Sequence, residues 1–135
     1  MTHLQPHRIV TALDCPDAVA LGTFYAELLG WELKTPGPDE PDFADPEWVA
    51  VVRADVGEHA FSLGFQRVHD FERPTWPEGP VPQQAHLDFW VDDLEASGEV
   101  ALGLGATRHD VQPSEDGGFV VYLDPVGHPF CLCRA

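Results

Sequence analysis

The feature of this sequence that most constrains its fold is an internal repeat. "DAVALGTFYAELLGWEL" (17–33) has apolar residues at helical spacing, reaches a glycine and continues into the strand-like "WEL". "DLEASGEVALGLGATR" (93–108) follows the same order, and Gly105 is expected to close its helix. Asp17 and Asp93 precede the two apolar stripes and are natural N-cap residues. The chain is therefore predicted to fold as two copies of one unit.

The strands around these helices repeat as well. "DVGEHAFSLGF" resembles "DPVGHPFCLCR", and "RIVTALD" resembles "AHLDFWV". Each half is therefore predicted to be a β-α-β-β-β module, which makes the fold class α+β. The proline-rich stretch "DFERPTWPEGPVPQQ" cannot form a central strand and is expected to join the modules. The expected boundaries within a single domain of residues 1–135 are 7–69 for the first module, 70–84 for the linker and 85–135 for the second module.

Alternation along the strands predicts two different sheet faces. One face is large and apolar and is expected to pack against the helices. The other carries small, polar and ionisable residues, which is typical of a sheet that curves around a pocket. The helix-facing set is Leu13, Phe61, Leu63, Phe65, Leu87, Phe89, Val91, Phe130 and Leu132. The pocket-facing set is Val10, Ala12, Ser62, Gly64, Gln66, His86, Asp88, Trp90, Cys131 and Cys133.

The charge balance limits the partners of this chain. Seven basic and 23 acidic residues give a net charge of −16, which repels nucleic acid and anionic membranes. We find no apolar run that resembles a signal peptide or a membrane span. The three cysteines do not follow a disulfide spacing, and Cys131 and Cys133 are too close in one strand to bridge each other. These features indicate a cytoplasmic protein that binds neither nucleic acid nor membrane.

Three segments carry a resemblance to a known superfamily. "FYAELLGWEL", "HLDFWVDDLEA" and "YLDPVGHPFCL" resemble the vicinal oxygen chelate superfamily, which includes glyoxalase I, extradiol dioxygenases and bleomycin-resistance proteins. The linker with the strand after it (73–94) looks like that of small glyoxalase-like proteins, and the resemblance covers roughly residues 8–134. It implies a cupped mixed sheet around a pocket, helices on the outer face, and a homodimer.

The resemblance also assigns the positions where metal-dependent relatives carry their ligands. These are Val10 and Ser62 in the first module and His86 and Cys131 in the second. Only His86 has an expected ligand type, since Val10 cannot bind a metal and Ser62 is a poor ligand. We therefore expect no cofactor. If a divalent metal does bind, His86 and Cys131 would hold it.

The pocket-facing residues have alternative roles. His86 is either a general acid–base oriented by Asp88 or a partly buried histidine that only bonds to it. Cys131 is either a nucleophile activated by a nearby histidine or a small buried apolar residue. Aromatic side chains at this face favour flat, weakly polar ligands. The residues expected to bind a ligand are Val10, Trp48, Ser62, Gln66, His86, Trp90, Cys131 and Cys133.

Two classes of function fit this pattern. The first is a glyoxalase-like protein that binds a small organic molecule and acts as a metal-independent lyase or isomerase, with His86 and Asp88 as its catalytic residues. The alternative is a non-catalytic protein of the bleomycin-resistance type that sequesters a drug or metabolite, where a net charge of −16 suits a cationic ligand. A metal-dependent dioxygenase or isomerase would require ligands that the sequence lacks.

Overall fold

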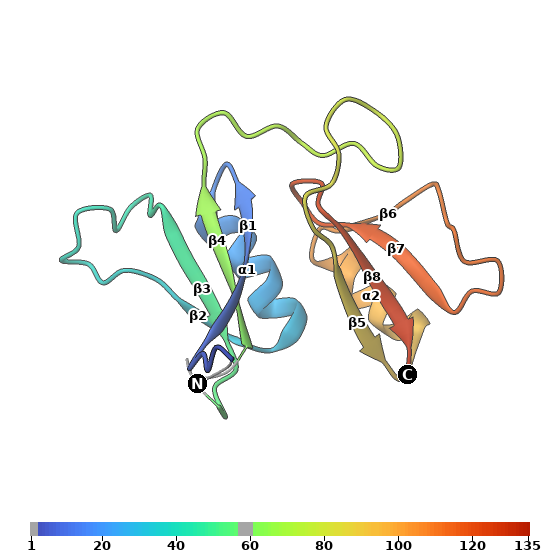
Figure 1. The fold of residues 1–135 in the computed structure, drawn as a ribbon, viewed down its shortest axis with the longest axis horizontal. Helices are drawn as coiled ribbons and strands as arrows, with labels where there is room; N and C mark the ends of the chain where they lie inside the picture. Colours follow the sequence, from blue (N-terminus) through green and yellow to red (C-terminus); the bar gives the residue numbers. More distant parts are fainter. Residues whose placement is uncertain (1–2, 57–60) are drawn as a thin grey trace. The chain divides into compact units, whose positions relative to one another are not determined.

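The computed structural model describes residues 3–56 and 61–135, and the chain forms two units, Met1–Phe71 and Glu72–Ala135. Each unit contains one four-stranded mixed sheet with one helix packed on it (Figure 1). The predicted pair of β-α-β-β-β modules is therefore confirmed. A cup shared by both modules stays a prediction. Part of the matched stretch "DVGEHAFSLGF" (57–60) lies outside the described residues.

The first module has the strand order β1-β4-β3-β2. Its first and last strands pair in parallel, and the other pairs are antiparallel. This order places the first and last strands of the module next to each other, so that residues from both ends share one face. Its elements are β1 (Ile9–Cys15), α1 (Ala18–Leu29), β2 (Glu32–Lys34), β3 (Trp48–Val52) and β4 (Phe61–Arg67).

Helix α1 begins and ends where the sequence predicts. The Asp17 side chain accepts a hydrogen bond of 3.0 Å from the backbone N–H of Ala20, which satisfies one of the free donors of the first turn. Gly30 ends the helix with a φ of 67°, a left-handed conformation that glycine adopts without steric cost.

The core of the first module lies between α1 and the sheet. Tyr25 stacks on Phe65 with ring centroids 5.4 Å apart, and both side chains are fully buried. Gly22 lets the helix approach closely, because a Cβ there would lie 2.7 Å from Val49 and 2.9 Å from Leu33. The predicted helix face is thus confirmed at Phe65.

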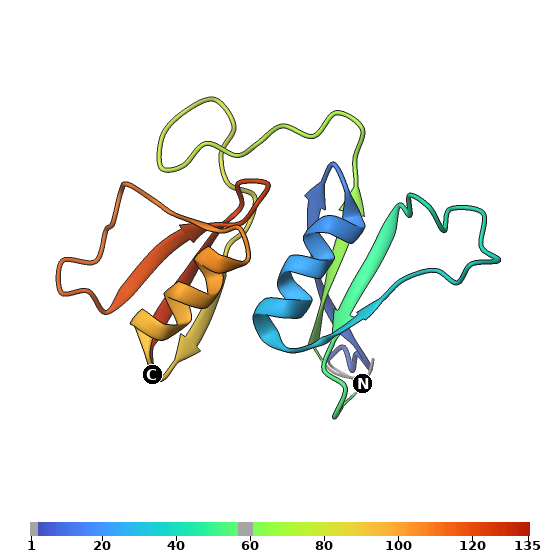
Figure 2. The same cartoon turned by 180° about the vertical axis from the view of Figure 1, so that it is seen from behind.

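The second module repeats the arrangement with the strand order β5-β8-β7-β6 (Figure 2). Strands β5 and β8 are parallel, and the other pairs are antiparallel. On its helix face, Phe130 stacks on Tyr122 with ring centroids 5.7 Å apart. Its elements are β5 (Leu87–Val91), α2 (Leu94–Gly103), β6 (Thr107–Arg108), β7 (Phe119–Leu123) and β8 (Pro129–Arg134).

Helix α2 begins as predicted but ends earlier than expected. The Asp93 side chain accepts from the backbone N–H of Ala96 at 3.0 Å. The last helical residue is Gly103, and Leu104 closes the helix by donating to the carbonyls of Val100 and Ala101. The predicted closing glycine lies one residue further on, with a φ of 112°, and reverses the chain after the helix has ended. No helix in the described ranges is long and apolar enough to cross a membrane.

The linker packs on the second module. The Arg73 guanidinium donates to the carbonyl of Pro125 at 3.3 Å, in the turn before β8. The Trp76 ring meets the His109 ring edge to face, with centroids 5.0 Å apart. These contacts explain why the second unit begins at Glu72.

Candidate ligand-binding site

The face of the second sheet that lies opposite α2 carries a depression of about 310 Å³. Five predicted site residues come together there, from β5 with the residue before it and from β8. Two lining residues were not predicted, Gly118 just before β7 and Phe119 at its start. The predicted residues that line it are His86, Asp88, Trp90, Cys131 and Cys133.

Strand register explains this clustering. In the parallel pair β5–β8, Asp88 lies beside Cys131 and Trp90 lies beside Cys133. Cross-strand partners point to the same face of a sheet, so these four side chains form one surface. Phe119 joins them because it pairs with Cys133 across β7 and β8. The residues of β7, FVVYL, are all apolar or aromatic, so the sequence does not show which face Phe119 takes, and only the strand pairing identifies its neighbours.

Asp88 is the charged centre of the depression. Its carboxylate oxygen Oδ1 lies 3.6 Å from Nε2 of His86, and both side chains are roughly half exposed. The same carboxylate accepts a hydrogen bond from the thiol of Cys131. Asp88 therefore contacts both of the residues that the sequence suggested as reactive groups.

Both thiols in the depression are held in the protonated form. Burial raises the pKa of Cys131 to about 12, and the negative charge of Asp88 and the hydrogen bond to it add to the rise. Burial also raises the pKa of Cys133, followed by the charge of Asp88. A thiol must lose its proton to act as a nucleophile, so the environment of Cys131 disfavours covalent catalysis. The alternative of a thiol that serves as a small, partly buried group agrees with this environment.

Trp90 presents an aromatic surface to solvent. Its side chain is 71% exposed, the largest exposed fraction of any tryptophan in the part of the chain that the structure describes. It sits beside Cys133 and two residues after Asp88 on the same strand face. An exposed ring in a depression next to a carboxylate offers an apolar platform and a negative charge to the same ligand.

The predicted site residues of the first module form a separate group on its own sheet. Val10 and Ser62 are cross-strand partners, as are Trp48 and Gln66. The Trp48 ring covers Gly64, where a Cβ would overlap the indole. Ser62 is fully buried, and its hydroxyl has no hydrogen-bond partner among the described residues.

The two modules differ in how their first and last strands are aligned. In the first module, the residue paired with Ser62 is Val10, seven residues before the helix cap Asp17. In the second module, the residue paired with Cys131 is Asp88, five residues before the cap Asp93. By its distance from the helix cap, His86 corresponds to Val10. By its pairing with the last strand of the module, Asp88 corresponds to Val10. The immediate neighbour of Cys131 is therefore Asp88, and His86 precedes the strand.

The arrangement of donor groups also bears on metal binding. Within residues 3–56 and 61–135, no three His, Cys, Asp or Glu side chains lie close enough together to hold a metal ion. The four ligand positions implied by the superfamily consist of a hydrocarbon, a hydroxyl, an imidazole and a thiol.

Solved structures with this fold come from several bacteria. The fosfomycin resistance protein FosX from Listeria monocytogenes, solved with Mn(II), is 14% identical, with a TM-score of 0.65 over 100% of this chain and 93% of that one. The antibiotic binding protein TnmS3 from Streptomyces sp. CB03234 is 21% identical, with a TM-score of 0.57 over 99% and 98%. The bleomycin-binding protein from Streptomyces verticillus is 19% identical, with a TM-score of 0.57 over 100% and 99%. At these identities the similarity shows the fold alone.

Sequence comparison gives the family. No curated protein matches this chain. The family model of the glyoxalase-like domain matches residues 10–133, which span both modules and the linker. With the two β-α-β-β-β modules and the fold it shares with fosfomycin-resistance and bleomycin-binding proteins, this match identifies the chain as a member of the glyoxalase-like domain family in the vicinal oxygen chelate superfamily.

Proposed function

We propose that this protein binds and sequesters a small, flat organic molecule that carries a positive charge. The observation that carries the proposal is the exposed Trp90 ring beside the Asp88 carboxylate in the depression of the second module. An aromatic face binds planar molecules by stacking, and a neighbouring carboxylate favours cations.

Electrostatics support a cationic ligand. No lysine or arginine is among the residues that line the depression, and both of its thiols are neutral. Asp88 is thus the main fixed charge there. The net charge of −16 adds a long-range attraction for cations, which raises their local concentration at the surface.

The proposal includes no metal. Val10 has no donor atom, and the hydroxyl of Ser62 is a weak ligand for a divalent ion. The thiol of Cys131 would have to lose a proton whose pKa burial and Asp88 raise to about 12. These residues do not fit the metal site of the metal-dependent relatives. Stoichiometric zinc, iron or nickel in protein purified without chelator would contradict this part of the proposal.

Two proteins with the same fold support the class of function. TnmS3 is described as an antibiotic binding protein, and the Streptomyces verticillus protein as bleomycin-binding. A binding role needs a platform and a charge but no reactive group, which agrees with the protonated state of Cys131.

Replacing Trp90 with alanine tests the proposal. The probes are N-methylacridinium, acridine and acridine-9-carboxylate, which share one ring system and differ in charge. We expect the native protein to bind the cation most tightly, and Trp90→Ala to weaken that binding about tenfold, since stacking on an aromatic ring contributes about 1–3 kcal/mol. Isothermal titration calorimetry measures all three dissociation constants.

Val100→Ala is the matched control for that experiment. Val100 is 52% exposed on α2, outside the residues that line the depression, so its removal should leave binding unchanged. Equal affinity of native protein and Trp90→Ala for N-methylacridinium, or tighter binding of the carboxylate than of the cation, would contradict the proposal.

The His86–Asp88 contact supports a second candidate function, a metal-independent lyase or isomerase. With Nε2 and Oδ1 3.6 Å apart, Asp88 can orient the imidazole for proton transfer. If the protein is an enzyme, His86→Ala should lower turnover about 10²- to 10⁴-fold while most of the affinity remains. Mass spectrometry of the recovered ligand measures turnover. A ligand that is recovered unchanged from native protein favours sequestration.

A further inference from the structure

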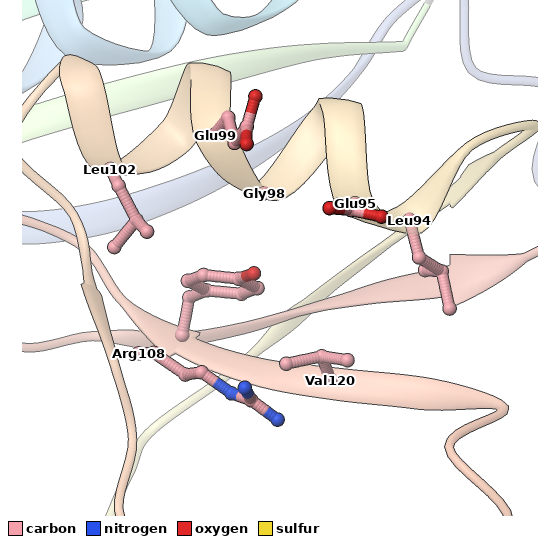
Figure 3. A pocket seen from close by; sticks show the side chains of 8 residues that line it. Leu94, Glu95, Gly98, Glu99, Leu102, Arg108 and Val120 are labelled. Atoms are coloured by element: carbon pink, nitrogen blue, oxygen red, sulfur yellow. The ribbon is translucent and has the colours of Figure 1, made fainter.

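A second cavity lies on the opposite face of the same sheet, between α2 and strands β6 and β7. It is an open groove of about 340 Å³ (Figure 3). Leu94 and Leu102 extend from the helix toward the sheet, and Val120 lies on the sheet side. Since Leu102 is 47% exposed, the groove leaves apolar surface in contact with water.

The groove exists because the repeat is packed differently in its two copies. Gly22 in α1 and Gly98 in α2 both lie five residues after the capping aspartate. In the first module, Val49 and Leu33 fill the space against this glycine. In the second module, the atom closest to the glycine is the hydroxyl oxygen of Tyr122. The aliphatic filling of the first copy is thus replaced by a polar atom in the second.

The Tyr122 hydroxyl is an unusual group to place there. The side chain is only 5% exposed, and its ring is held in place by stacking on Phe130. No hydrogen bond to the hydroxyl is found within the described residues, and the hydroxyl is not among the buried unpartnered atoms, so it meets the water that fills the groove. A ligand with a matching polar group can therefore replace the water at this hydroxyl without displacing a protein partner.

Charged residues stand on the two sides of the groove. Glu95 and Glu99 lie one turn apart on the helix side, and Arg108 lies on the sheet side beside Tyr122. Across the described part of the chain, Arg108 forms no ion pair with either glutamate. The carboxylates of the groove therefore remain available to a cation from solution.

We propose that this groove is a second binding site, and that its ligand is a primary amine with an apolar chain. An ammonium group donates three hydrogen bonds, so it can reach the Tyr122 oxygen and a carboxylate of Glu95 or Glu99 at once. Its apolar chain covers Leu94, Leu102 and Val120. Arg108 repels the ammonium from the sheet side and so orients it toward the helix.

The test compares three six-carbon probes that differ only in their head group: n-hexylammonium, hexanol and hexanoate. NMR titration of the full-length, ¹⁵N-labelled protein gives both the dissociation constants and the site. We expect n-hexylammonium to bind several-fold more tightly than hexanoate, since each charged contact at an open site gives up to about fivefold. The amide signals of Glu95, Gly98 and Val120 should shift.

Variants assign the contacts. The double substitution Glu95→Gln with Glu99→Gln and the single substitution Tyr122→Phe should each weaken n-hexylammonium binding about threefold to tenfold, while Arg108→Gln should leave it unchanged or tighten it. Glu115→Gln removes one negative charge in the loop between β6 and β7 and should have little effect.

Three results would overturn this second site. The first is hexanoate binding as tightly as n-hexylammonium. The second is unchanged affinity in both the double glutamate variant and Tyr122→Phe. The third is a set of shifts confined to Asp88 and Trp90 on the other face, which would indicate binding at the first site only. Failure of the first site, by contrast, would appear in the acridine experiments and leave the groove titration unchanged.

Discussion

Replacing Asp88 with asparagine is expected to make Cys131 react faster with iodoacetamide at pH 9, by about tenfold for each unit by which the pKa of the thiol falls. Burial is the largest cause of the rise in the pKa of this thiol to about 12, and the charge of Asp88 and the hydrogen bond to it follow. Asparagine keeps the size and an acceptor oxygen but removes the charge. Peptide mapping after timed alkylation measures the rate at Cys131 separately from Cys15 and Cys133.

The same shift predicts how stability depends on pH. The pKa of Cys131 is raised from 9.0 to about 12 in the folded state, so the folded protein keeps a proton that the unfolded chain releases. The stabilisation is therefore complete below pH 9 and is lost as pH rises from about 9 toward 12. Urea unfolding at several pH values should show this decline in the free energy of unfolding, and the decline should be smaller in Asp88→Asn.

An unchanged alkylation rate in Asp88→Asn would show that burial alone protects the thiol of Cys131.

Phe130→Ala is expected to lower the free energy of unfolding by about 3–5 kcal/mol, the usual cost of removing a fully buried phenylalanine. Phe130 is 0% exposed and packs between Tyr122, at 5.7 Å, and Phe89, at 5.9 Å between ring centroids. Its loss leaves a cavity beneath α2. Equilibrium urea denaturation followed by circular dichroism measures the change.

The repeat supplies the control for this substitution. Phe61 occupies the same place in "HAFSLG" that Phe130 occupies in "HPFCLC", but it is 47% exposed. Phe61→Ala should therefore cost about 1 kcal/mol or less, because a half-exposed ring loses much less buried area. If both substitutions cost the same, Phe130 does not carry the packing that its burial indicates.

Local features made much of the fold predictable from sequence. Helix caps depend on residues within one turn, so Asp17, Asp93 and Gly30 could be assigned without knowing the tertiary structure. The alternation of large and small residues gave the helix face at Phe65 and Phe130 for the same reason. The end of α2 was the exception, because its last turn closes through Leu104 before the glycine is reached.

Contacts between distant strands were harder to predict. Whether His86 or Asp88 lies next to Cys131 depends on how β5 aligns with β8, which counting along the chain cannot decide. Phe119 belongs to the depression only because β7 pairs with β8. The groove beneath α2 depends on the hydroxyl of Tyr122 meeting Gly98, a contact between residues that no motif links.

The two-residue difference in strand alignment limits how such a duplicated protein can diverge. Side chains alternate between the faces of a strand, so an offset of two residues leaves every side chain on its original face. An offset of one would turn Asp88 and Trp90 toward the helix and bring Leu87 and Phe89 into the depression. A shift of β5 along β8 that keeps the same side chains on the binding surface must therefore be an even number of residues.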